Sequence, residues 1–355
     1  MAVVANPAFY AIVCYCVSSI LMTVTNKLVL SSYEFRLNFF LLAVQSLVCV
    51  LMLESFLGAG LISRRKFKVD DAKKWFIVSL ALVAMIYTGA RALAYLSIPL
   101  FTIFKNITII LIAYCERILL AGSPVTPLML VAFAMMVSSS LIAGWSDLQS
   151  HGAIKQTSGE AEVSVAVAIA WMAANCATTA GFALLMKKKI KEVGFKEFDT
   201  VFYNNALSIP VLLVASLLTE QSTGAATWAK YTANPEYEGQ MRGLVFGIVL
   251  SGISSFGISY STAWCMRVTS STTYSMVGAL NKLPIAVAGM LFFDDHVTLG
   301  GVCGVVIAFL AGIVYSHAKN MQNRTGAKPT SSLPLPAMTH AERVRTGAYD
   351  KVAES

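Results

Sequence analysis

Charged side chains are scarce in this sequence. Only 13% of its 355 residues are Asp, Glu, Lys or Arg, whereas 56% are hydrophobic. Soluble globular domains carry about 25% charged residues, because their surfaces face water. The shortage of charge therefore excludes an ordinary soluble domain and predicts a polytopic membrane protein.

Features that would support a disulfide framework, a metal centre or a nucleic-acid site are also missing. The seven cysteines all fall inside apolar stretches, where cysteine acts as a small hydrophobe. The Asp-Asp-His sequence at 294–296 has no further metal ligands beside it, and no basic patch is interleaved with aromatic residues. We therefore expect no metal, no cofactor and no nucleic-acid partner.

Long apolar stretches recur along the chain. A transmembrane helix needs about 20 mostly apolar residues, and ten stretches meet this requirement. No basic segment precedes the first stretch, so we expect an uncleaved anchor rather than a signal peptide. The ten predicted spans are 9–30, 37–57, 75–96, 98–119, 127–145, 163–186, 198–219, 243–265, 270–292 and 298–317.

Lysine and arginine are distributed unevenly over the predicted loops. Six basic residues lie within 64–74 and five within 187–196, whereas the segments 146–162 and 220–240 hold one lysine each. Loops rich in lysine and arginine stay in the cytosol. Because the number of spans is even, we predict that both termini are cytosolic. The formal net charge of +8 then reports topology rather than nucleic-acid binding.

The ten spans suggest two halves of five helices. An odd number of helices per half gives the halves inverted topologies, as in many transporters. The segment after the last span is polar and too poor in apolar residues to form a core. The predicted organisation is a short cytosolic N-terminus at 1–8, a first half at 9–145, a luminal loop at 146–162, a second half at 163–318 and a disordered cytosolic tail at 319–355.

Small residues recur at every fourth position in the last predicted span. Gly300, Gly304, Ala308 and Gly312 would let a neighbouring helix approach closely. A similar but less complete row occurs in the span 127–145. Such rows serve packing within one chain or the face of a homodimer, and the sequence leaves both open.

Lys282 lies near the middle of a predicted span. An ammonium group in hydrocarbon costs roughly 2.5–3.5 kcal/mol, so such a lysine usually faces a water-filled cavity and meets an anion. An internal salt bridge is the structural alternative, although only Glu54 is an acid that could lie at comparable depth. Helical spacing gives Lys282 three polar or small neighbours on its own face. They are Tyr274, Gly278 and Asn281.

Other polar side chains inside predicted spans are weaker candidates. Lys105 would bind an anion or extend its amine to the nearer membrane surface. Asn204 and Asn205 would join helices or contact a base edge, since an amide both donates and accepts hydrogen bonds. Tyr15 and Ser259 belong to polar helix faces, but hydroxyls in spans usually bond their own backbone.

These polar positions fall within motifs of a known family. The chain resembles the fungal Golgi GDP-mannose transporters, which belong to the nucleotide-sugar branch of the drug/metabolite transporter superfamily. The resemblance runs from about residue 9 to residue 318. It rests on Ser-Ser-Ile-Leu-Met-Thr-Val-Thr-Asn-Lys at 18–27, Thr-Ile-Phe-Lys-Asn at 102–106, Phe-Tyr-Asn-Asn at 202–205 and Ser-Ser-Thr-Thr-Tyr-Ser-Met-Val-Gly-Ala-Leu-Asn-Lys at 270–282.

The resemblance implies an all-α membrane protein with ten helices in two inverted five-helix halves. It implies exchange of cytosolic GDP-mannose for luminal GMP in the Golgi membrane. Asn204 and Asn205 would recognise guanine, and Asn281 and Lys282 would recognise the mannose and phosphate end. By the same resemblance, the other substrate-binding positions are Tyr15, Lys105, Ser259, Tyr274 and Gly278.

Charge makes such an exchange reasonable. GDP-mannose and GMP each carry about two negative charges, so one-for-one exchange moves little net charge. The expected partners are these two nucleotides and membrane lipid. A carrier for a UDP-sugar or another GDP-sugar is the alternative within the class. A membrane glycosyltransferase would need an acidic cluster in a sizeable loop, which the segment 220–240 lacks. We therefore expect a transporter rather than an enzyme.

Overall fold

The computed structural model describes residues 7–32, 37–151, 165–221, 224, 238–281 and 299–326. Over these ranges the chain is helical and contains no strand, which confirms the predicted all-α class. The helices are α1 (Pro7–Ser32), α2 (Asn38–Gly58), α3 (Val69–Tyr95), α4 (Ile98–Leu119), α5 (Pro127–His151), α6 (Val165–Val193), α7 (Glu197–Thr219), α9 (Glu238–Val268), α10 (Ser271–Leu280) and α12 (Leu299–Gly326).

The helices match the predicted membrane spans closely. Within the described residues, nine helices are long and apolar enough to cross a membrane. The remaining predicted span, 270–292, is represented by α10, which ends at Leu280, and the structure describes this span only as far as residue 281. Lys282, the 294–296 triplet, most of the predicted luminal loop and most of the predicted tail lie outside the described residues.

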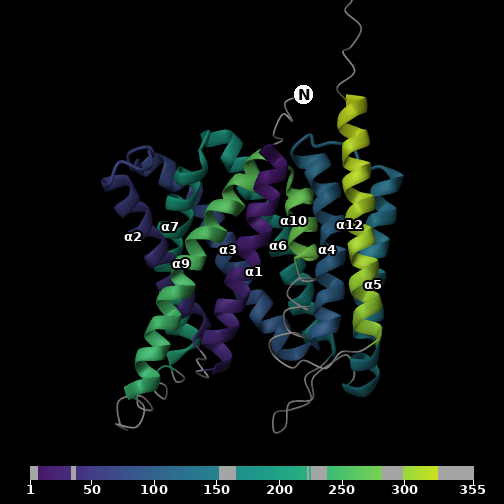
Figure 1. The fold of residues 1–355 in the computed structure, drawn as a ribbon, viewed down its shortest axis with the longest axis horizontal. Helices are drawn as coiled ribbons and strands as arrows, with labels where there is room; N and C mark the ends of the chain where they lie inside the picture. Colours follow the sequence, from purple (N-terminus) through teal and green to yellow (C-terminus); the bar gives the residue numbers. More distant parts are fainter. Residues whose placement is uncertain are drawn as a thin grey trace, which may run out of the picture.

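The axes of the helices are roughly parallel to one another, and the helices form one bundle (Figure 1). α1 begins and α12 ends at the same end of this bundle, which is uppermost in Figure 1 and which we call the termini end. The opposite end is the distal end. The connections from α2 to α3 and from α6 to α7 lie at the termini end, so the two basic segments 64–74 and 187–196 are on one side of the bundle.

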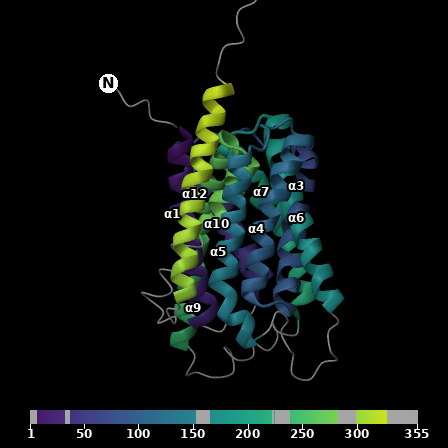
Figure 2. The same cartoon turned by 90° about the vertical axis from the view of Figure 1, so that its right-hand side faces the viewer.

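α12 packs along α5, as both views of the bundle show (Figures 1 and 2). A Cβ atom on Gly304 would lie only 2.7 Å from the Cβ of Ala143, and one on Gly300 would lie 2.8 Å from the carbonyl oxygen of Ile142. Glycine at these positions therefore lets the two backbones approach each other. At Gly300 and Gly304, the predicted row of small residues serves packing within the chain.

Several helices extend past the predicted spans, among them α3, α6 and α12. α3 begins at Val69 instead of 75, α6 continues to Val193 instead of 186, and α12 continues to Gly326 instead of 317. The additional turn of α3 contains Asp70 and Asp71, whose negative charges favour the N-terminus of a helix. These turns are polar and extend the helices beyond their apolar segments.

Candidate functional site

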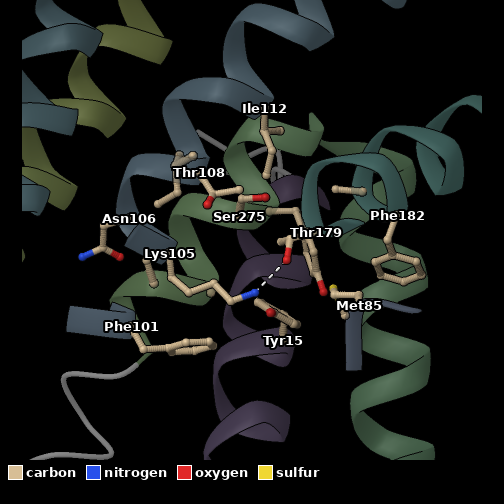
Figure 3. Close-up of a pocket in the computed structure, with 15 residues that line it drawn as sticks. Tyr15, Met85, Phe101, Lys105, Asn106, Thr108, Ile112, Thr179, Phe182 and Ser275 are labelled. Carbon is tan, nitrogen blue, oxygen red and sulfur yellow. Dashed lines mark hydrogen bonds between the residues drawn. The ribbon is translucent and has the colours of Figure 1, made fainter. Parts of the chain in front are cut away.

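A cavity of about 240 Å³, which we call the central cavity, lies between α1, α3, α4, α6 and α10 (Figure 3). Four of the residues predicted from the sequence line it. They come from three helices that are far apart in the chain. They are Tyr15 of α1, Lys105 of α4, and Tyr274 and Gly278 of α10.

Lys105 places a positive charge in the wall of the central cavity. Its Nζ donates a hydrogen bond to Thr179 Oγ1 at 2.6 Å, and it lies 5.5 Å from the centre of the Phe101 ring. Figure 3 shows the side chain crossing from α4 toward α6. A half-buried ammonium group held by a hydroxyl in a cavity is suited to attract an anion.

Tyr15 and Tyr274 form an aromatic wall of the central cavity. Their ring centroids are 5.1 Å apart and the rings are tilted by 46°. Gly278, one turn after Tyr274, makes this arrangement compatible with α10, because a Cβ atom there would lie 3.1 Å from the hydroxyl of Tyr15. Aromatic faces of this kind pack against flat or apolar ligand groups.

A second cavity of about 530 Å³, the distal cavity, adjoins the central one. The two share Met85, Phe101 and Lys105 in their linings. The distal cavity reaches Asn38, the first residue of α2, which lies at the distal end. Lys105 is therefore approached from the distal end of the bundle.

Polar contacts hold α4 and α10 together between the central cavity and the termini end. The carboxylate of Glu116, which is 7% exposed, accepts hydrogen bonds from the backbone N–H groups of Ser271 at 2.8 Å and Thr272 at 2.9 Å. The hydroxyl of Thr272 donates a third bond. A carboxylate at a helix N-terminus satisfies backbone donors that have no partner inside the helix.

Further contacts fix the neighbouring helices at the same end. The ammonium group of buried Lys187 donates to backbone carbonyls at the end of α9 and just after it. The backbone N–H of Arg65 donates to Asp199 Oδ1 at 2.8 Å. Glu54 pairs with Arg64, so this acid belongs to the termini end. Together these contacts tie neighbouring segments of the bundle to one another on that side.

A comparable contact occurs at the distal end. Glu220 follows α7, and its carboxylate accepts from the backbone N–H groups of Phe39 at 2.8 Å and Phe40 at 3.1 Å. The hydroxyl of Ser216 donates a further bond at 2.8 Å. This contact ties the end of α7 to the start of α2.

The predicted residues of α7 and α9 do not line the central cavity. Asn205 is buried and donates to the carbonyl of Val201, one turn earlier, at 2.9 Å. Asn204 has a buried Oδ1 atom without a hydrogen-bond partner in the described part of the chain. Ser259 is half-buried on α9. None of these three residues shares the lining of the central cavity with Lys105 and the two tyrosines.

Tyr203, within the same Phe-Tyr-Asn-Asn motif, makes contacts that support the packing of α7. Its ring stacks on Phe195 with centroids 4.7 Å apart, and its hydroxyl accepts the backbone N–H of Lys68 at 2.8 Å. The side chain is 1% exposed. Tyr203 thus fastens α7 to the segment before α3.

Asn281 caps the end of α10 and is 3% exposed. Among the described residues its Nδ2 atom has no hydrogen-bond partner. It lines a different cavity, of about 980 Å³, together with Cys16 and residues of α12. Buried amide groups usually have partners, so this donor remains available for a further contact.

The structure adds lining residues that the sequence analysis did not single out. Thr179 and Phe182 come from α6, and Met85 comes from α3. The only available signal was the pair of threonines at 178–179 inside an apolar span. Nothing in the local pattern of α3 distinguishes Met85 from the other apolar residues of that helix.

Comparison with known proteins identifies the family. The model of the UAA transporter family matches residues 8–319. The chain belongs to the UAA transporter family. This UAA transporter is 50% identical, over 95% of its length, to an Aspergillus niger protein of which it covers 88%. It is 51% identical, over 93% of its length, to a Phaeosphaeria nodorum protein of which it covers 87%. Both relatives are named GDP-mannose transporter.

The comparisons confirm the resemblance that the motifs indicated and the expectation of a transporter rather than an enzyme. A crystal structure of another protein, only 10% identical, matches with a TM-score of 0.61. The match covers 88% of this UAA transporter and 97% of the other chain. At this identity it supports the fold alone.

Proposed function

We propose that this UAA transporter imports GDP-mannose from the cytosol into the Golgi lumen in exchange for GMP, by alternating access. The observation that carries the proposal is its identity of 50–51%, over 93–96% of its length, to three fungal proteins named GDP-mannose transporter. The third of these is from Coccidioides immitis. The charge of the central cavity supports the same substrate class.

The lining of the central cavity suits a nucleotide sugar. Lys105 supplies a positive charge for phosphate, and Tyr15 and Tyr274 supply aromatic faces for a base or a sugar ring. With about 240 Å³, the cavity is smaller than the roughly 300–1,000 Å³ of usual ligand pockets. We infer that the helices separate further when a nucleotide sugar binds, so that Asn281 and Lys282 of the predicted site join Lys105.

The termini end is proposed to face the cytosol, because the basic segments 64–74 and 187–196 lie there. The distal cavity would then connect Lys105 to the lumen. Helix contacts support two inverted halves, with α1 to α5 matching α6, α7, α9, α10 and α12 in order. Under this correspondence the contact between α3 and α6 matches that between α9 and α1, and the contact between α2 and α9 matches that between α7 and α3.

Uptake of labelled GDP-mannose into liposomes that contain the purified full-length chain tests the proposal. The liposomes are preloaded with GMP, with UMP or with no nucleotide. Uptake is expected only with GMP inside. Equal uptake with UMP would overturn the guanine assignment, and inhibition by external UDP-sugars would favour the alternative substrate. Equal uptake into empty liposomes would rule out obligatory exchange.

The homodimer and the role of lipid remain predictions. Gly300 and Gly304 already contact α5, so these two glycines are not available for a face between two copies. The particle mass of the chain in lipid nanodiscs would show its oligomeric state, and uptake in liposomes of different composition would show its lipid requirement.

A further inference from the structure

A separate polar cavity lies at the termini end, and we call it the lysine cavity. It measures about 270 Å³ and lies between the ends of α4, α6 and α12 and the start of α10. It shares no lining residue with the central cavity. The proposed transport mechanism makes no use of it. Its charged lining residues are Lys187, Lys191, Lys319 and Glu116.

Positive charge is in excess in the lysine cavity. Three lysines against one glutamate leave two positive charges in the lining. Lys187 and Lys191 lie four residues apart on α6, one above the other on the same helix face, and both line the cavity, so their charges repel each other. Lys187 is buried, which weakens solvent screening on its side of the pair, so an anion in the cavity would relieve the repulsion.

The one carboxylate in the lining is already engaged. Both oxygens of Glu116 accept hydrogen bonds from the start of α10, so its negative charge is compensated by the N-terminus of that helix. The ammonium group of Lys187 also has partners, because it donates hydrogen bonds to backbone carbonyl groups at the end of α9 and just after it. These contacts shape the cavity but leave its other two lysines to a ligand.

Lys191 and Lys319 each have ammonium N–H groups that can donate hydrogen bonds to a ligand. Lys191 is exposed at the rim and makes no hydrogen bond or ion pair with the described residues. Lys319 is half-buried and bonds Gln322 Oε1 at 3.1 Å, which uses one of its three N–H groups. The hydroxyls of Ser123, Ser270 and Tyr315 complete the polar wall, and those of Ser270 and Tyr315 each lie 3.0 Å from the hydroxyl of Thr273.

We propose that the lysine cavity binds phosphate groups. Basic residues near a membrane surface often contact only water and lipid headgroups. Here, however, lysines from α6 and α12 converge on a concave wall that also offers hydroxyls. A phosphate group accepts several hydrogen bonds and carries the charge that this lining lacks. Its source is either a soluble organic phosphate or the headgroup of a phospholipid, and the experiment below separates them.

The proposal that phosphate binds here depends only on the residues that line the lysine cavity. A role of this site in transport would, in addition, rest on the proposed function. If the termini end faces the cytosol, the lysine cavity lies on the side from which the nucleotide sugar arrives. The closing experiment therefore measures binding without transport. Its failure would leave the exchange of GDP-mannose for GMP standing, and failure of that exchange would leave the phosphate site standing.

The experiment measures the unfolding temperature of the purified full-length chain in neutral detergent. Every sample carries Lys105→Gln, so that the lysine of the central cavity does not contribute. Sodium pyrophosphate is compared with sodium chloride of equal ionic strength. We expect pyrophosphate to raise the unfolding temperature by about 2–5 °C, and the added pair Lys191→Gln and Lys319→Gln to abolish the rise. Lys188→Gln, an exposed lysine of the same helix outside the lining, is the matched control and should keep it.

A second arm identifies the source of the phosphate. The same variants are reconstituted in vesicles of phosphatidylcholine, with or without about 5% phosphatidylinositol 4-phosphate. Stabilisation by this lipid that needs Lys191 and Lys319, without any effect of pyrophosphate, identifies a headgroup. Stabilisation by pyrophosphate identifies a soluble phosphate. The proposal is overturned if neither probe stabilises the protein, or if the paired variant responds as Lys188→Gln does.

Discussion

The ammonium group of Lys105 on α4 donates a 2.6 Å hydrogen bond to the hydroxyl of Thr179 on α6, across the wall of the central cavity. The two residues are 74 positions apart in the chain. Thr179 thus orients the charge that the proposed substrate would meet. This relationship links a residue that the sequence analysis singled out to one that it did not.

Replacing Lys105 by glutamine should lower the apparent affinity for GDP-mannose about 10- to 100-fold. A hydrogen bond to a charged group contributes about 1.5–3 kcal/mol, and glutamine keeps a polar, slightly shorter side chain without the charge. Concentration-dependent uptake in liposomes measures the change, with Lys188→Gln as the control. Thr179→Val should have a smaller effect, because the lysine remains. Unchanged uptake by Lys105→Gln would remove this residue from the proposed site.

Gly278→Ala should impair uptake, and Tyr15→Phe should partly restore it. The added Cβ would lie 3.1 Å from the hydroxyl of Tyr15, and phenylalanine lacks this oxygen. A double-mutant cycle on uptake rates measures the coupling between the two positions. Gly181→Ala is the matched control, because a Cβ atom there would meet no side chain or neighbouring helix of the described residues within 4 Å. Additive effects in the cycle would contradict the contact.

Gly304→Ala should destabilise the fold by about 1–3 kcal/mol, the usual cost of overpacking. Its Cβ would lie 2.7 Å from the Cβ of Ala143 and 2.8 Å from the carbonyl oxygen of Ser139. The unfolding temperature in detergent measures the effect. Gly58→Ala meets no atom within 4 Å and serves as the control. Equal unfolding temperatures would show that α5 and α12 are less closely packed.

Glu116→Gln should also lower stability, by about 1–3 kcal/mol, because the amide retains only one acceptor oxygen. One of the donors from Ser271 or Thr272 would then lose its partner. Glu192→Gln is the comparison, since that carboxylate is exposed and, among the described residues, pairs with Lys189 of its own helix. The same unfolding assay applies. A loss no greater than that of Glu192→Gln would show that the cap of α10 is dispensable.

The helices could be predicted from the sequence because bilayer thickness imposes their apolar length. The ends of α3 and α6 could not, since their polar turns at 69–74 and 187–193 leave the apolar segments and still remain helical. Hydropathy identifies only the part of a helix that lies in the apolar layer of the membrane. The polar residues beyond that layer can continue the same helix, and hydropathy does not reveal them.

The site could be predicted only where one helix carried the pattern. The face of α10 with Tyr274 and Gly278 follows from helical spacing, and both residues line the central cavity. Thr179 and Met85 could not be inferred, because their position depends on how α3 and α6 pack against α4. Whether Asn204, Asn205, Ser259 and Lys282 bind substrate stays a prediction.

The packing of Tyr203 determines how mutations in its motif have to be interpreted. Its ring rests on Phe195 and its hydroxyl holds the backbone of Lys68, so truncating it disturbs the support of α7 without touching the central cavity. Loss of transport in a Tyr203 variant would therefore not show that Tyr203 contacts the substrate. Scanning mutagenesis of residues 202–205 separates binding from support only when protein yield and melting temperature are recorded for each variant beside its uptake.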